Sequence, residues 1–93
     1  MRAVTYSAFG PAKDVMSVVE MNQPTPAPGE VLVKLEYSGA NPSDAKARAG
    51  ARPGVTKPAF DIIIPNSDGS GVISAVGEGV DPARIGTRVW IWN

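Results

Sequence analysis

Glycine and proline interrupt this chain so often that they limit what it can fold into. The sequence holds ten glycines and nine prolines among its 93 residues. No helical pattern of three or four turns survives between them, because both residues break helices. β-Branched and aromatic residues, which favour strands, fill the intervals. The spacing therefore predicts a loop-rich, mainly β chain that forms one small domain over residues 1–93.

The best-defined strand is expected at residues 30–38. Apolar side chains recur there at the two-residue period of a pleated sheet, at Val31, Val33, Leu35 and Tyr37. One face of this strand is therefore expected to be apolar throughout. Four further strands are expected at residues 2–7, 15–22, 70–76 and 87–92.

A short helix is expected to start at Asn41. Asn41 suits a helix cap, Pro42 the first helical position and Asp44 the first turn, while Gly50 suits the position past the end. One or two helical turns fit between these signals.

Three connections are also expected from local composition. The prolines at residues 24–29 fix a stiff, extended crossing. Residues 77–82 are typical of a hairpin connection, because glycines supply positive φ and Pro82 prevents the ladder from continuing. Residues 51–58 show no periodicity and predict a surface loop.

The sequence contains neither cysteine nor histidine, which excludes several kinds of site. Disulfides, thiolate nucleophiles, imidazole bases and the usual zinc and copper ligands are all missing, so we expect no bound metal. Nine basic residues balance nine acidic ones. This balance gives no electrostatic footprint for nucleic acid, and we expect no nucleic-acid partner.

The amino terminus lacks the apolar run of a signal peptide, and no stretch approaches the roughly 20 apolar residues of a membrane span. We therefore expect a cytoplasmic protein with no membrane partner.

Gly69-Ser70-Gly71 imitates the opening of a dinucleotide-binding loop. The third glycine of that motif is missing, and the next residues continue as a strand, so no helix amino terminus would face a phosphate. We expect these glycines to allow tight sheet packing instead.

The polar residues of the short helix have two interpretations. Asp44 and Arg48 lie four positions apart, so on a helix they would face each other as an ordinary ion pair. Alternatively, Asn41, Asp44, Lys46 and Arg48 gather hydrogen-bonding groups on one loop and helix, where sites are commonly built. Spacing alone leaves both interpretations open.

Three segments, taken in order, resemble a known family. They are Pro24-Thr25-Pro26-Ala27-Pro28-Gly29-Glu30-Val31-Leu32-Val33-Lys34, then Gly39-Ala40-Asn41-Pro42-Ser43-Asp44, then Asp68-Gly69-Ser70-Gly71-Val72 with Val76-Gly77-Glu78-Gly79-Val80. The chain is similar, from Met1 to Asn93, to the medium-chain dehydrogenase/reductase superfamily, on its zinc-free quinone oxidoreductase (zeta-crystallin-like) side. The resemblance implies a GroES-like, partly open β-barrel with one or two short helical turns. It also implies that this domain is incomplete and that a Rossmann NAD(P)-binding domain would follow position 93.

The resemblance bears on zinc as well. Zinc-dependent members place Cys where Asn41 stands and a His-Glu pair where Ser67-Asp68 stands, whereas the zinc-free reductases have the Asn41 and Asp44 pattern. The chain departs from those reductases at three positions, with Lys46 for a common Tyr, Asn66 for the usual Gly, and Thr87 for Asp.

The function implied by the resemblance is NADPH-dependent reduction of a quinone or an α,β-unsaturated carbonyl by hydride transfer. Asn41 and Lys46 would be the catalytic residues, donating hydrogen bonds to the substrate carbonyl or the nicotinamide ribose. Asp44 and Arg48 would support their loop, and the cofactor-binding residues would lie beyond Asn93. The chain by itself is expected to be inactive and to bind no NADPH.

The alternative is a stand-alone, non-catalytic GroES-like interaction module. In either case, the strand at residues 87–92 would leave an apolar edge that carries Trp90 and Trp92. Uncovered edges pair with other chains, so we expect a homo-oligomer.

Overall fold

The computed structural model describes residues 1–50 and 53–92, which divide into two compact units. Unit 1 comprises Met1–Asn22 and Ala40–Asn66, and unit 2 comprises Gln23–Gly39 and Ser67–Asn93. The expected loop at 51–58 therefore begins outside the described residues, and its described positions 53–57 are exposed.

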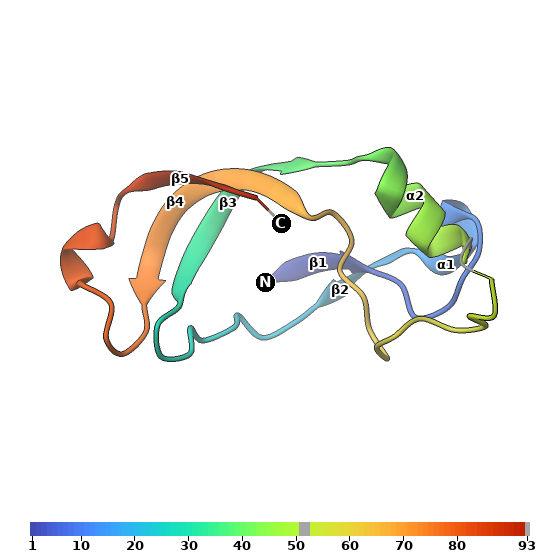
Figure 1. Ribbon diagram of the computed structural model, residues 1–93, viewed down its shortest axis with the longest axis horizontal. Helices are drawn as coiled ribbons and strands as arrows, with labels where there is room; N and C mark the ends of the chain where they lie inside the picture. Colours follow the sequence, from blue (N-terminus) through green and yellow to red (C-terminus); the bar gives the residue numbers. More distant parts are fainter. Residues whose placement is uncertain (51–52, 93) are drawn as a thin grey trace. The chain divides into compact units, whose positions relative to one another are not determined.

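Unit 1 is built on a two-stranded antiparallel ladder (Figure 1). Strand β1 (Arg2–Thr5) pairs with β2 (Ser17–Glu20), and the short helix α1 (Ala12–Val15) lies between them in sequence. Just after β1, Tyr6 and Ile63 exchange two backbone hydrogen bonds of 3.0 and 2.9 Å. Thr5 and Tyr6 are both buried, so the interior of this unit lies where β1 ends.

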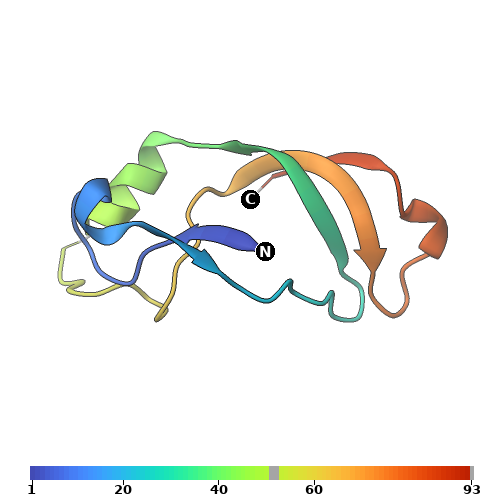
Figure 2. The ribbon, with the colours of Figure 1, turned by 180° about the vertical axis from the view of Figure 1, so that it is seen from behind.

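Helix α2 (Pro42–Ala49) follows the expected signals closely. Asn41 caps it in an extended conformation, and Gly50 ends it in the left-handed region with φ 71°. A Cβ at Gly50 would lie 2.5 Å from the Phe9 ring, so this position needs glycine for space as well. The Gly10 N–H donates to the Arg48 carbonyl at 3.0 Å, and Figures 1 and 2 place α2 beside the segment between β1 and α1.

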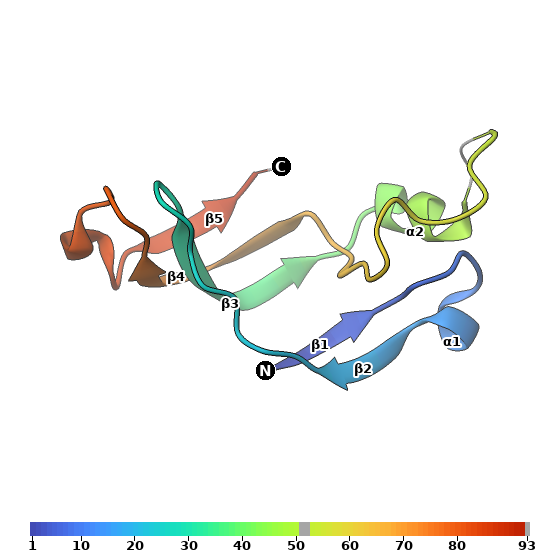
Figure 3. The same cartoon turned by 90° about the horizontal axis from the view of Figure 1, so that it is seen from below.

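Unit 2 is a three-stranded antiparallel sheet in the order β3-β4-β5 (Figure 3). The strands are β3 (Val31–Gly39), β4 (Asp68–Val76) and β5 (Arg88–Ile91). Ile73, in the central strand, is 1% exposed and forms the buried centre of the sheet. A Cβ at Gly71 would collide with the Lys34 carbonyl oxygen, which confirms that the Gly69-Ser70-Gly71 segment is a strand packed closely on its neighbour.

Two β-bulges interrupt the β3–β4 ladder, one between residues 32 and 33 and one between residues 35 and 37. At the second, Leu35 pairs with Gly71 and Tyr37 pairs with Ser70, so Glu36 is the extra residue. An extra residue turns the following side chains to the opposite face. Tyr37 therefore lies on the face opposite Leu35, and the prediction of one continuous apolar face is wrong. Tyr37 is 73% exposed.

The mainly β, open-sheet prediction is confirmed, and all five expected strands form with slightly different ends. Two short helices were not expected. Helix α1 follows Pro11 and contains Val15, so the expected strand at residues 15–22 starts later, at Ser17. The connection from β4 to β5 includes the 3-10 helix η1 (Pro82–Arg84), which Asp81 caps by accepting the Ala83 N–H at 2.9 Å. Within the described residues, the helices are all too short or too polar to cross a membrane.

Candidate functional site

Asp44 joins two segments of unit 1 through its carboxylate. Oδ2 accepts the backbone N–H of Asn41 at 2.8 Å, which is one half of a capping box at the start of α2. Oδ1 accepts the backbone N–H of Asn66 at 3.2 Å. Charge-assisted bonds of this kind are stronger than neutral ones. The carboxylate therefore holds the helix start and the end of the 40–66 segment together.

Asn66 adopts a backbone conformation that few side chains tolerate. Its φ is 75°, and within the described part of the chain it is the one non-glycine residue with positive φ. Asn is among the residues that enter this region most readily. Glycine, which the resemblance implies at this position, would adopt the same conformation freely. Sequence reasoning noted the substitution but did not recognise Asn66 as a partner of Asp44.

Arg48 does not form the expected ion pair with Asp44. Both Asp44 oxygens accept backbone N–H groups, and Nη1 of Arg48 instead lies 3.6 Å from the Met16 sulfur. The Arg48 Nε is buried and has no hydrogen-bond partner among the described residues. The ion-pair interpretation is therefore wrong, and Arg48 contributes to unit 1 through packing and through its carbonyl, which accepts the Gly10 N–H.

Asn41 and Lys46, the expected catalytic residues, both belong to the α2 region and are both exposed. Asn41 lies at the cap, where the bond from Asp44 fixes its backbone. Lys46 lies in the second helical turn. A small molecule can thus reach an amide and an ammonium group on one short helix whose amino end is rigidly held.

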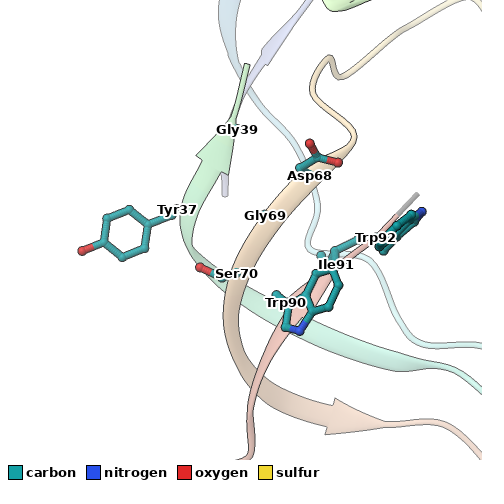
Figure 4. Close-up of a pocket in the computed structure, with 8 residues that line it drawn as sticks. All are labelled: Tyr37, Gly39, Asp68, Gly69, Ser70, Trp90, Ile91 and Trp92. Atoms are coloured by element: carbon teal, nitrogen blue, oxygen red, sulfur yellow. The ribbon is translucent and has the colours of Figure 1, made fainter. Parts of the chain in front are cut away.

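An open pocket of about 630 Å³ lies on unit 2, where the three strands come together (Figure 4). Aromatic rings, glycines and two short polar side chains line it: Tyr37, Gly39, Asp68, Gly69, Ser70, Trp90, Ile91 and Trp92.

The two tryptophans form an aromatic wall of this pocket. The Trp90 and Trp92 ring centroids are 5.9 Å apart with the ring planes tilted by 48°. The side chains are 69% and 82% exposed. Tyr37 points outward from β3, away from both rings (Figure 4). Sequence reasoning treated Trp90 and Trp92 only as an apolar strand edge; their i, i+2 spacing was the available sign of a shared face.

Members of the family that the chain resembles use two groups, a metal ion and a dinucleotide, which need different kinds of residues. Over residues 1–50 and 53–92, no three acidic side chains gather into a set that could hold a metal ion. For a dinucleotide, Gly69 and Gly71 lie inside β4, and no helix begins after them to face a pyrophosphate.

Comparison with curated proteins gives both reductases and dehydrogenases. An alcohol dehydrogenase of Moraxella sp. (strain TAE123) is 36% identical over 100% of this chain. A quinone oxidoreductase of Rattus norvegicus is 32% identical over 100% of the chain. The chain spans 27% of the length of each relative.

The similar solved structures likewise include both a protein bound to NADPH and an alcohol dehydrogenase. A mycobacterial protein solved in complex with NADPH superposes with a TM-score of 0.80 and 31% identity, over 97% of this chain and 27% of that one. A thermostable alcohol dehydrogenase of Pyrobaculum aerophilum, solved with cobalt and zinc, gives a TM-score of 0.81 and 36% identity, over 100% of this chain and 26% of that one.

Residues 27–93 match the family model described as the alcohol dehydrogenase GroES-like domain. Together with these relatives, the match shows that the chain belongs to the alcohol dehydrogenase GroES-like domain family of the medium-chain dehydrogenase/reductase superfamily.

Proposed function

We propose that the chain is the substrate-side domain of an NADPH-dependent oxidoreductase that reduces a quinone or an α,β-unsaturated carbonyl. The quinone oxidoreductase relatives and the neighbour solved with NADPH support this assignment. Because the chain spans about a quarter of these relatives, the proposal places the dinucleotide-binding Rossmann domain outside residues 1–93.

The start of α2 carries the proposal. The Asp44 carboxylate fixes the Asn41 backbone there, and the Asn41 and Lys46 side chains remain exposed on the same helix. The side-chain donors of Asn41 and Lys46 thus extend from a helix whose start is fixed by a hydrogen bond. Donors in fixed positions are what stabilisation of a developing oxyanion requires.

In the proposed reaction, bound NADPH supplies the hydride, and this chain binds and polarises the acceptor. The Asn41 amide donates a hydrogen bond to the carbonyl oxygen of the substrate or to the nicotinamide ribose. The Lys46 ammonium places positive charge near the same oxygen and carries a proton that it can donate. The Asn41, Ser67 and Asp68 set lacks the soft ligands of zinc, so the proposed reaction is zinc-independent.

The test uses the longest polypeptide that the reading frame containing this chain encodes. NADPH oxidation is followed with 1,4-benzoquinone and with methyl vinyl ketone as acceptors. Replacing Asn41 with Ala, or Lys46 with Ala, is expected to lower kcat/KM by about tenfold or more. Replacing Lys57, an exposed lysine outside α2, with Ala is the matched control and should leave kcat/KM unchanged.

Two outcomes contradict the proposal. Activity that survives both α2 substitutions would show that Asn41 and Lys46 do not act on the substrate. A folded protein without any NADPH-dependent reductase activity would favour the alternative of a non-catalytic GroES-like interaction module.

A further inference from the structure

We propose that the pocket of unit 2 is a binding site for planar aromatic cations. This inference concerns unit 2 alone and does not require the reductase activity proposed above. It rests on the shape of the aromatic wall, on the charge of the lining residues and on the way the strands hold both.

The aromatic wall suits a flat ligand. Trp90 lies in β5 and Trp92 directly follows its end, with their ring centroids 5.9 Å apart, and both side chains are largely exposed. Exposed tryptophan faces attract flat rings by offset or tilted stacking. They also attract cations, because the negative face of the indole ring interacts with positive charge.

Asp68 gives the pocket a single sign of charge. It is the one residue with a formal charge among the eight that line the pocket, and the others are glycine, serine, isoleucine and aromatic residues. A carboxylate beside aromatic rings complements a planar cation that donates hydrogen bonds, and it repels an anion of the same shape.

The sheet registers bring these groups together without a loop. Gly39 pairs with Asp68 and Gly69 pairs with Ile91, so glycines of β3 and β4 lie beside the charged and apolar residues. A Cβ at Gly39 would lie 3.3 Å from the Asp68 Cβ, and a side chain there would crowd the carboxylate. The glycines therefore keep the approach to Asp68 open.

The test uses three probes of the same shape and different charge on the 93-residue chain. Benzamidine is a planar cation, benzamide is neutral and benzoate is an anion. Binding is measured by quenching of tryptophan fluorescence, with line broadening of the probe proton signals as the second readout. Benzamidine is expected to bind about fivefold more tightly than benzamide, and benzoate more weakly than either.

Substitutions assign the charge preference to its source. Asp68→Asn is expected to abolish the difference between benzamidine and benzamide. The matched control, Asp61→Asn, removes an exposed carboxylate of unit 1 and should keep that difference. In the unmodified chain, raising the salt concentration should weaken benzamidine binding and leave benzamide binding unchanged. This measurement tests the contribution of charge to binding even if a variant fails to fold.

Equal affinity for benzamidine and benzamide in the unmodified chain would overturn the proposal. So would a benzamidine preference that persists in folded Asp68→Asn. Failure of all three probes to bind, at protein concentrations where light scattering shows monomers, would also overturn it.

Discussion

The Asp44 carboxylate and the Asn66 backbone, 22 positions apart in sequence, are joined by a hydrogen bond of 3.2 Å. The bond fixes the one described non-glycine residue with positive φ. Because the same carboxylate also accepts the Asn41 N–H, the cap of α2 and the left-handed turn at Asn66 depend on each other. A substitution that disturbs the cap of α2 should therefore also disturb the turn at Asn66, and the reverse.

Asn66→Ala should destabilise the chain by about 1 kcal/mol, because alanine pays the steric cost of the left-handed region without the local hydrogen bonding available to Asn. Asn66→Gly should be neutral within about 0.5 kcal/mol, since glycine enters this region freely. Urea unfolding of both variants measures the difference. Equal stability of the two variants would mean that the φ of 75° is not an energetic constraint.

Arg48→Met should leave the stability unchanged or raise it by up to about 1 kcal/mol. The substitution keeps a long side chain beside Met16 and removes the buried Nε that has no partner in the described structure. Thermal unfolding followed by circular dichroism gives the measurement, with Arg84→Met, an exposed arginine of η1, as control. A loss above about 1.5 kcal/mol would indicate that Arg48 has a polar partner that the structure does not contain.

Gly71→Ala should destabilise unit 2 by roughly 2 kcal/mol or more, because the added methyl group collides with the Lys34 carbonyl and forces β3 and β4 apart. Gly79→Asn is the contrasting variant. Gly79 has φ 85° and no atom within 4 Å of a built Cβ, and Asn tolerates positive φ, so its cost should stay below about 1 kcal/mol. Chemical denaturation that ranks the two variants in the opposite order would contradict this account of the strand packing.

Assembly is the fourth prediction. Strand β5 pairs with β4 on one side, and in the described residues nothing pairs with its other side. An uncovered edge beside the exposed Trp90 and Trp92 favours pairing with a second copy. Light scattering should detect dimers or larger species, and Trp92→Lys should shift the distribution toward monomer. A monodisperse monomer at high concentration, unaffected by this substitution, would refute the prediction.

Strong local signals explain which parts of the fold could be predicted from the sequence. Helix α2 has a cap, a proline and a terminal glycine that all agree. The first half of β3 alternates Val31 and Val33 with other residues, and β4 contains Val72 and Ile73, which favour strands. Helix α1 has only four residues, which is too short for any periodicity to appear.

The site was less accessible to sequence reasoning. The apolar alternation through Tyr37 is unbroken in the sequence, so nothing in it revealed the bulge. The pocket draws Tyr37, Asp68 and Trp90 from three strands, and only the strand registers bring them together. The Asn66 conformation likewise depends on a bond to a residue far away in sequence.

The bulge at Glu36 decides which face of β3 carries Tyr37. If β3 lost the bulge but kept Glu36, Glu36 would pair with Ser70 and Tyr37 would move to the face that carries Leu35, with every lining residue chemically unchanged. A shift of register at this point of the strand is thus a route by which related domains can alter what they bind. Substitution patterns alone would not reveal such a change.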